Sequence, residues 1–335
     1  MTPRLRALLF LVGGGAFALM VAHAGVHTIL ATIGAVGWLV VPIVLLYGVV
    51  QLFYAASWQT IMAAEPVSPP FVRTCAITVS TLALNFITPF VQAGGEPFRV
   101  AAAAAWLGRR RAVGSVVLYT MLHALSSLLL WFSALVVALI VVPHRPLLTA
   151  GLLAVMAVVA ALAGLVLIGH SGGVLGRLLS VLRVLPLLRR FAPAIESRRG
   201  ALDEVDQQIM DFHRRAPGRF VLALLLDFTG RVISVGEFWL ICRGAGVEVG
   251  FAQAYLIGGL LALAINASFF VPFELGSKEA ALYFIYHLAG LAPELGVAAS
   301  VVTRVRELAW VAIGVGLVWA TGRRAVRTAG ESAGH

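Results

Sequence analysis

The chain has 335 residues, of which 60% are hydrophobic and 12% charged, and its formal net charge is +10. Its successive apolar stretches have the length of about 20 residues that an α-helix needs to cross a bilayer. They exclude a water-soluble globular protein and predict an all-α polytopic membrane protein. The positive charge does not indicate a nucleic-acid partner, because 24 of the 25 basic residues are Arg and most lie between apolar runs. There they set orientation and contact anionic headgroups.

Cysteine usage points away from metal or redox chemistry. The two cysteines, Cys75 and Cys242, lie at the edges of apolar runs without metal-like spacing. This pattern predicts neither a disulfide framework nor a metal site. We therefore expect no metal and no cofactor.

The apolar pattern predicts about six full spans. The first, 7–28, follows a basic N-terminus that also resembles a cleavable signal peptide, but the pattern continues and favours a retained span. The other spans are 38–58, 112–142, 147–169, 219–242 and 297–321. Two further apolar stretches, 71–107 and 251–292, are each interrupted in the middle by Pro, Gly and charged residues.

The distribution of basic residues predicts that both termini are cytoplasmic. In this topology the two interrupted stretches must each enter the membrane and return to the same side, 71–107 from the cytoplasm and 251–292 from outside. Of the 25 basic residues, 18 are then cytoplasmic, two are external and five lie at membrane depth. We expect residues 1–335 to form a single integral membrane domain.

An Arg-rich segment, 171–217, separates two of the spans. Its apolar residues recur at helical spacing from Leu202 to Phe212, and Arg214 and Arg215 follow them, which suits the helix dipole. We expect two interfacial helices on the cytoplasmic side. A solvated loop is equally consistent with this composition.

The two interrupted stretches resemble each other at a separation of 181 residues. LALNFITPFVQAGGEPFR aligns with LAINASFFVPFELGSKEA, which places Asn85 over Asn266 and Gly95 over Gly276. The pattern predicts two re-entrant helical hairpins in an inverted repeat, an architecture in which discontinuous helices meet at a central site. Broken backbone at membrane depth must be buried in protein or line a wet cavity, so we expect both tips to line a midplane polar cavity.

The hairpin tips supply most of the candidate functional residues. The N-termini of the second arms would offer free N–H groups and positive dipole ends to an anion such as a lipid phosphate. The two Asn side chains are expected either to satisfy the broken backbone or to form a hydrogen bond with the ligand, and we favour the backbone role. The candidate translocation residues are Asn85, Pro89, Gln92, Gly94, Gly95, Glu96, Arg99, Asn266, Pro272, Glu274, Gly276, Lys278, Glu279, Arg304, Arg306 and Glu307.

Charged residues also occur within the spans, although each costs about 2.5–3.5 kcal/mol on insertion scales. Asp227 and Arg231 are separated by four residues and can pair on one helix face. Together with Glu237 they form a secondary polar group, and for the pair we favour a role as interhelical glue.

The last span carries three further charges. Glu307 is expected to pair with Arg304 at i,i+3. Arg306 then lies on a different face of the helix from Arg304 and needs another partner. That partner is expected to be Glu96, Glu274 or Glu279 of a hairpin, or a substrate phosphate.

One histidine and several aromatic residues in the spans are expected to have structural roles. His123, within an apolar span, is typical of a hydrogen-bonded core histidine rather than a ligand or a proton relay. Trp38, Tyr54 and Trp58 lie near span ends and predict an aromatic belt at the membrane interface.

The hairpin residues resemble a known family. Asn85, Pro89, Gly94, Gly95, Glu96 and Arg99 are similar to the signature of the lysylphosphatidylglycerol synthase transmembrane region, a flippase-like family, and Pro272, Gly276 and Glu279 are similar to its later element. Arg306 lies where the last helix of that family carries an Arg. The run 304–310 and the chain length look most like the hopanoid-biosynthesis-associated members. Relatives that synthesise aminoacyl-lipids append a soluble catalytic domain, for which this sequence has no segment, so the resemblance implies translocation rather than synthesis.

These observations together predict a lipid flippase or translocase of the bacterial inner membrane, moving an anionic or isoprenoid/hopanoid-type lipid. No ATP-binding motif occurs, so transport would use an ion gradient or lipid consumption, or would be scrambling without energy input. Membrane lipids are the expected partners, with lipid-biosynthesis enzymes and a second copy of the chain as further candidates. The alternatives are an intramembrane lipid-modifying enzyme that uses Glu96 or Glu279 as general acid or base, and a non-transporting scaffold of a lipid-biosynthesis complex.

Overall fold

The computed structural model describes residues 34, 36–88, 94–143, 145–170, 207, 212, 216–268, 274 and 276–332. This part of the chain is helical apart from short connections and contains no strand, which confirms the all-α class. The first predicted span and most of the predicted interfacial segment lie outside the described residues. So do three predicted site residues, Pro89, Gln92 and Pro272.

A short 3₁₀ helix, Gly37–Leu39, leads into the first described α-helix. The helices are α3 (Val40–Met62), α4 (Phe71–Ile87), α5 (Gly95–Leu107), α6 (Arg109–Val141), α7 (Pro146–His170), α11 (Pro217–Gly244), α12 (Phe251–Ala267), α13 (Ser277–Leu288) and α14 (Pro293–Ser332). Helix-breaking residues mark several boundaries. Pro70 precedes α4, and Gly108 separates α5 from α6 with a φ of 74°, which glycine adopts without the steric cost of a side chain.

Three of the described helices are long and apolar enough to cross a membrane. They are Gly37–Met62, Arg109–Val141 and Pro146–Leu167, and they match the predicted spans 38–58, 112–142 and 147–169. The predicted spans 219–242 and 297–321 fall within α11 and α14, the helices that carry the interior charges. The total of six full spans stays a prediction.

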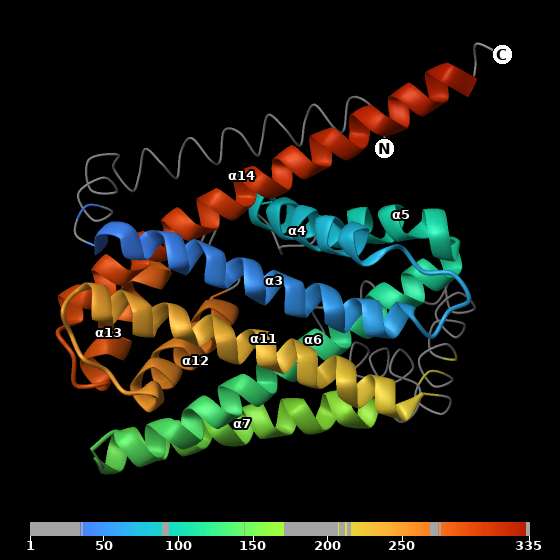
Figure 1. Ribbon diagram of the computed structural model, residues 1–335. Coiled ribbons are helices and arrows are strands. Elements are labelled where there is room, and N and C mark those ends of the chain that lie inside the picture. The colour runs from blue at the N-terminus through green and yellow to red at the C-terminus, as the bar shows by residue number, and fades with distance from the viewer. Residues whose placement is uncertain are drawn as a thin grey trace, which may run out of the picture.

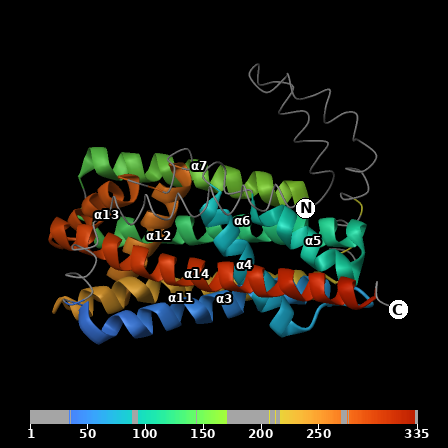
Figure 2. The same cartoon turned by 90° about the horizontal axis from the view of Figure 1, so that it is seen from above.

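The long helices lie side by side, and their direction gives the molecule its long axis (Figure 1). α3 packs against α11, α4 and α6, and α14 packs against α4 and α13. α5 and α13 lie toward opposite ends of this axis in both views (Figures 1 and 2). The two interrupted stretches therefore place their second arms at opposite ends of the bundle.

The two interrupted stretches have closely similar helical structure. α4 and α12 have 17 residues each, whereas α5 has 13 and α13 has 12. Their first residues, Phe71 and Phe251, and Gly95 and Ser277, are separated by intervals within one residue of the sequence offset. At 1.5 Å per residue the first arms are about 25 Å long and the second arms about 18–20 Å, all shorter than the hydrocarbon thickness of about 30 Å. The agreement of lengths and positions supports the internal repeat.

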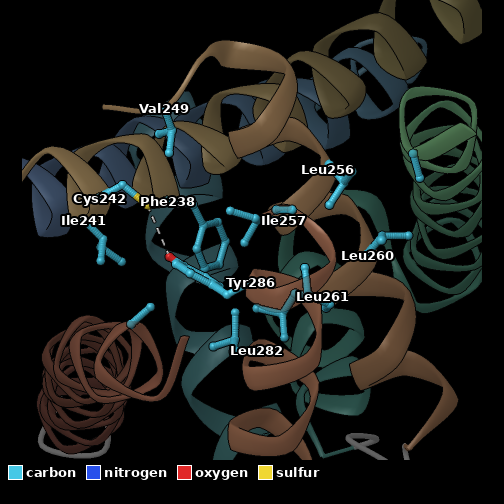
Figure 3. Packing of buried hydrophobic residues seen from close by; sticks show 14 of the residues in the cluster. Phe238, Ile241, Cys242, Val249, Leu256, Ile257, Leu260, Leu261, Leu282 and Tyr286 are labelled. Atoms are coloured by element: carbon cyan, nitrogen blue, oxygen red, sulfur yellow. Dashed lines mark hydrogen bonds between the residues drawn. The ribbon is translucent and has the colours of Figure 1, made fainter. Parts of the chain in front are cut away.

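A large apolar core anchors α13 to the rest of the bundle. Figure 3 shows Phe238 and Ile241 of α11, several leucine and isoleucine side chains of α12, and Leu282 and Tyr286 of α13 packed together. Cys242 and Tyr286 also form a hydrogen bond, with 3.5 Å between sulfur and oxygen. This packing fixes the orientation of α13 and hence the position of its N-terminus. A second apolar cluster joins α3, α5 and α6 in the same way.

Candidate functional site

The N-terminus of α13 begins at an unusual piece of backbone. Glu274 has a φ of 55°, a region that non-glycine residues seldom adopt, and Gly276 has a φ of 78°. The Gly276 N–H donates to Oε2 of Glu279 over 2.8 Å, so Glu279 caps the helix that it belongs to. This local structure holds the carboxylate of Glu279 at the helix tip.

Seven charged residues of α11, α13 and α14 and the tip that precedes α13 gather at this end of the bundle. This α13 cluster consists of Glu237, Glu274, Lys278, Glu279, Arg304, Arg306 and Glu307. The pairing differs from the sequence prediction. Glu307 pairs with Lys278, while Arg304 Nε donates to Glu279 Oε1 over 2.9 Å. The predicted Arg304–Glu307 pair is replaced because α13 packs against α14 and brings its own charges to the same face.

Arg306 also has a different partner from the one predicted. Its Nε lies 3.0 Å from Glu237 Oε1 and its Nη2 lies 3.3 Å from Glu307 Oε1. Its guanidinium carbon is 4.0 Å from the centre of the Tyr47 ring. The prediction of a hairpin acid was wrong, because α11 carries Glu237 against α14 at this depth. Both side chains of this ion pair are buried.

The N-terminus of α5 forms the corresponding tip, and its described polar residues are Asn85, Thr88, Gly94, Gly95, Glu96 and Arg99. We call this group the α5 site. Asn85 Oδ1 accepts the N–H of Gly95 over 2.7 Å, and Thr88 Oγ1 accepts the N–H of Gly94 over 3.3 Å. The predicted backbone role of Asn85 is confirmed. A Cβ at Gly95 would lie 2.5 Å from the carbonyl oxygen of Thr81, so the close approach of α4 requires glycine there.

The second hairpin does not repeat this arrangement among the described residues. Asn266 Nδ2 donates to the carbonyl oxygen of Ala262 within its own helix, and its side chain is exposed. The two repeat-related asparagines therefore have different roles.

Arg99 is the main charged group of the α5 site. It is only 5% exposed, and its guanidinium carbon lies 4.6 Å from the centre of the Tyr119 ring and 5.1 Å from that of Trp58. Glu96 Oε2 lies 3.6 Å from Arg99 Nη1, too far for a hydrogen bond. Among the described residues Nε and Nη1 of Arg99 have no hydrogen-bond partner, and residues 89–93 contain no carboxylate. Arg99 is thus a buried cation whose hydrogen-bonding capacity the described residues do not fill.

A third polar group lies between α6 and α11. His123 Nδ1 is 2.8 Å from Asp227 Oδ2, and Asp227 Oδ1 is 3.3 Å from Arg231 Nε. Arg231 also donates to Ser126 Oγ over 3.0 Å and to the His123 carbonyl oxygen over 2.8 Å. We call these four residues the histidine group. The predicted Asp227–Arg231 pair and the hydrogen bond of His123 are both confirmed.

One face of α3 connects the three groups. Tyr47, Tyr54 and Trp58 are spaced by seven and four residues, which places them on the same side of the helix, and we call them the α3 aromatic stripe. Tyr54 lies 5.9 Å from the guanidinium carbon of Arg231, so each ring of the stripe contacts an arginine from a different helix. Such contacts are favourable because the ring faces are electron-rich.

The sequence analysis missed this stripe. Trp58 was assigned to an interface belt but is fully buried, and Tyr54 contacts His123 and Arg231 in the interior. Trp38 is 77% exposed, and its place in an interface belt stays a prediction. The helical spacing of the rings was a usable signal, but nothing in one sequence showed which residues would face them.

The arrangement places an arginine at three depths along α3. Tyr47 and Trp58 are 11 residues apart, or about 16 Å along the axis. The charges of the two tips thus form groups at different levels along α3. The shared midplane cavity stays a prediction, because residues 89–93 and 269–273 lie outside the described residues. The described part of the chain holds no group of three His, Cys, Asp or Glu residues that could bind a metal ion.

Comparison with known proteins gives one match. The family model described as the lysylphosphatidylglycerol synthase TM region matches residues 6–316. No curated protein matches the chain, and no solved structure does.

Proposed function

The chain belongs to the lysylphosphatidylglycerol synthase transmembrane family, and from this premise we propose that it is a lipid translocase of the bacterial cytoplasmic membrane. Its substrate is a lipid with an anionic headgroup, and a hopanoid or other isoprenoid lipid is the class suggested by the sequence resemblance. Membership of this family gives the protein a membrane location and a lipid-related role. The finer assignment depends on the arrangement of its buried charges.

The observation that carries the proposal is the set of three arginines along the α3 aromatic stripe, of which Arg99 and Arg306 are buried and Arg231 is partly buried. A phosphate-bearing headgroup does not cross hydrocarbon unaided, because removing its charge from water is costly. Buried arginines offset this cost, since the guanidinium donates paired hydrogen bonds to phosphate. Arg99 is the best first receptor, because its partners within the described structure leave two of its nitrogens, Nε and Nη1, without a hydrogen-bond acceptor.

The α4–α5 and α12–α13 pairs are proposed to be re-entrant hairpins that enter from opposite sides of the membrane. Three observations support this: the helix lengths agree between the pairs, their positions agree with the sequence repeat, and α5 and α13 lie at opposite ends of the bundle. The excess of basic residues on one side supports cytoplasmic termini. In this arrangement the headgroup passes along the charges while the tails remain in the bilayer.

Translocation rather than catalysis is the proposed activity. The acids of the α13 cluster have Arg or Lys as their partners, which suits binding better than proton transfer to a substrate. Membrane lipids are the proposed partners. Association with lipid-biosynthesis enzymes, or with a second copy of the chain, is compatible with this role.

A liposome assay tests the proposal. The purified protein is reconstituted into phosphatidylcholine vesicles that contain a trace of phosphatidylglycerol with a fluorescent label, and a membrane-impermeant quencher is added outside. Translocation makes the inner-leaflet probe accessible to the quencher, whereas protein-free vesicles keep it protected. Chemical change of the lipid in mass spectrometry would instead favour the enzyme, and the absence of both movement and change would favour the scaffold.

Arg99→Gln provides the decisive variant. We expect translocation to slow by about tenfold or more, because a hydrogen bond to a charged group contributes about 1.5–3 kcal/mol. Arg243→Gln is the matched control, since Arg243 also lies over an aromatic ring, 5.2 Å from the centre of Trp239, but is exposed. Unchanged translocation in Arg99→Gln would reject the proposed path.

A further inference from the structure

The histidine group contains a titratable side chain that the proposed lipid path does not use. His123 is 15 residues into the 33-residue helix α6, and Asp227 is 11 residues into the 28-residue helix α11. Asp227 is fully buried, whereas 37% of the His123 side chain is exposed. Within the described structure the aspartate is therefore fully covered, whereas the histidine ring is only partly covered.

The hydrogen bonds decide which nitrogen of His123 takes up a proton. Asp227 faces Arg231 with its other oxygen, so its carboxylate is held ionised and accepts the Nδ1–H of His123. Nδ1 keeps its proton in both states of the ring, and the second proton must bind at Nε2. No described residue forms a hydrogen bond with Nε2. The histidine thus has one nitrogen oriented by the protein and one that can titrate.

Only the second proton of His123 changes the net charge of the histidine group, as its neighbours show. The ring of Tyr119 on α6 stacks at 5.5 Å between centres, and Tyr54 on α3 meets it edge-on at 5.1 Å. The charged neighbours from α11 are Asp227 and Arg231, whose charges cancel. Arg231 is held in place by its bonds to α6. The net charge of the group is therefore zero or +1, according to the state of His123.

Tyr119 links this charge to the α5 site. The same ring that stacks on His123 also lies 4.6 Å from the guanidinium carbon of Arg99. A protonated His123 adds a second cation against this ring and raises the positive potential around Arg99. An anion bound at Arg99 offsets that potential, so proton and anion favour each other's binding, and the effect is reciprocal.

We propose that His123 binds one proton together with an anionic phosphodiester headgroup at Arg99, which makes the protein a proton-coupled lipid translocase. The inference rests on the proposed function and adds its energy source. A monoanionic lipid that moves with one proton carries no net charge across the bilayer. The proton gradient then drives lipid movement, and loss of the proton from Nε2 on the other side promotes release of the headgroup.

Binding tests the coupling directly. The full-length protein in a neutral detergent is titrated with a short-chain phosphatidylglycerol from about pH 5 to about pH 8, the range in which histidine changes its charge. The fluorescence of Trp58, which lies beside Arg99, is part of the signal. We expect affinity to fall as pH rises in the wild type. His123→Asn keeps an amide donor for Asp227 but takes up no proton, so its affinity should not depend on pH.

Matched variants complete the binding test. His287→Gln, an exposed histidine at the end of α13, should keep the wild-type pH dependence. His123→Gln is a second variant in case His123→Asn unfolds. A pH-independent affinity in the wild type, or a pH dependence that survives in both His123 variants, would overturn the coupling. Failure of the wild type to bind at every pH would overturn both the coupling and the proposed receptor.

Transport in the liposome assay separates the two proposals. A difference of one pH unit across the membrane should shift the leaflet ratio of labelled phosphatidylglycerol by about tenfold, because one proton accompanies each lipid. The His123→Asn variant should show no such accumulation. Movement of the probe that does not respond to the pH gradient would reject proton coupling but would still support the translocase proposal. Absence of movement would reject the translocase, and pH-dependent binding would then still support the proton site.

Discussion

The α5 site and the α13 cluster each surround the N-terminus of the second helix of an interrupted stretch, but they differ in how their charges are paired. In the α13 cluster, Lys278, Arg304 and Arg306 each contact a carboxylate of another helix. In the α5 site, Arg99 lies against two aromatic rings, and its carboxylate contact comes from its own helix. The two groups therefore differ in role. The α13 cluster connects three helices through ion pairs, whereas the α5 site holds a buried arginine that can bind an anionic ligand.

The largest effect on unfolding stability is expected from breaking the Glu237–Arg306 ion pair of the α13 cluster. Glu237→Gln removes the carboxylate beside Arg306, and breaking a buried ion pair from one side costs about 3–5 kcal/mol. Thermal unfolding in detergent should show a clear loss of stability. Glu294→Gln, an exposed acid in the first turn of α14, is the control and should have little effect.

A double variant checks the cause of that loss. Adding Arg306→Met to Glu237→Gln removes the guanidinium that has lost one of its two carboxylate contacts, and we expect most of the stability to return, because buried pairs are often replaceable by apolar side chains. A double variant as unstable as the single one would contradict the ion-pair explanation.

An intermediate effect is expected at the repeat-related asparagines. Asn85→Ala leaves the Gly95 N–H without its acceptor, at a cost of about 1–3 kcal/mol. Asn266→Ala, at an exposed position bonded only to its own helix, should stay within about 0.5 kcal/mol. Equal loss of unfolding stability in the two variants would show that the tips are more alike than their hydrogen bonds indicate.

The smallest effect on stability is expected at the receptor. Arg99→Gln removes favourable ring contacts of about 0.5–2 kcal/mol, but it also removes the desolvation cost of a buried charge that is incompletely paired. The unfolding midpoint should therefore change much less than in Glu237→Gln, while translocation slows by about tenfold or more. Strong destabilisation by Arg99→Gln would assign Arg99 to the structural role instead and remove the contrast between the tips.

The sequence analysis was most accurate where local pattern decides the outcome. The helical class, three of the spans and the Asp227–Arg231 pair follow from apolar run length and i,i+4 spacing. The role of Asn85 was predictable because a broken backbone needs a hydrogen-bond partner wherever it is buried. Family membership was recognisable because the tip residues keep a characteristic order along the chain.

The errors concern residues that meet across helices. Arg306 was predicted to pair with an acid of a hairpin but pairs with Glu237 of α11. Trp58 was predicted to lie at the membrane interface, but its ring contacts Arg99. In each case the residue type and helix were correct, and the partner was wrong. A single sequence specifies the face on which a residue lies, but it does not state which face of another helix will pack there.

The sequence by itself therefore determined a helical membrane protein of this family. It also determined that two apolar stretches are interrupted and that several charged residues lie within the spans. These properties depend on composition, run length and near-neighbour spacing. Only the tertiary structure decided that three arginines share one aromatic face of α3, that the α13 charges are paired between helices, and that Tyr119 joins His123 to Arg99. The physical reason is that ion pairs and ring contacts require atoms within a few ångströms, and helix packing sets those distances.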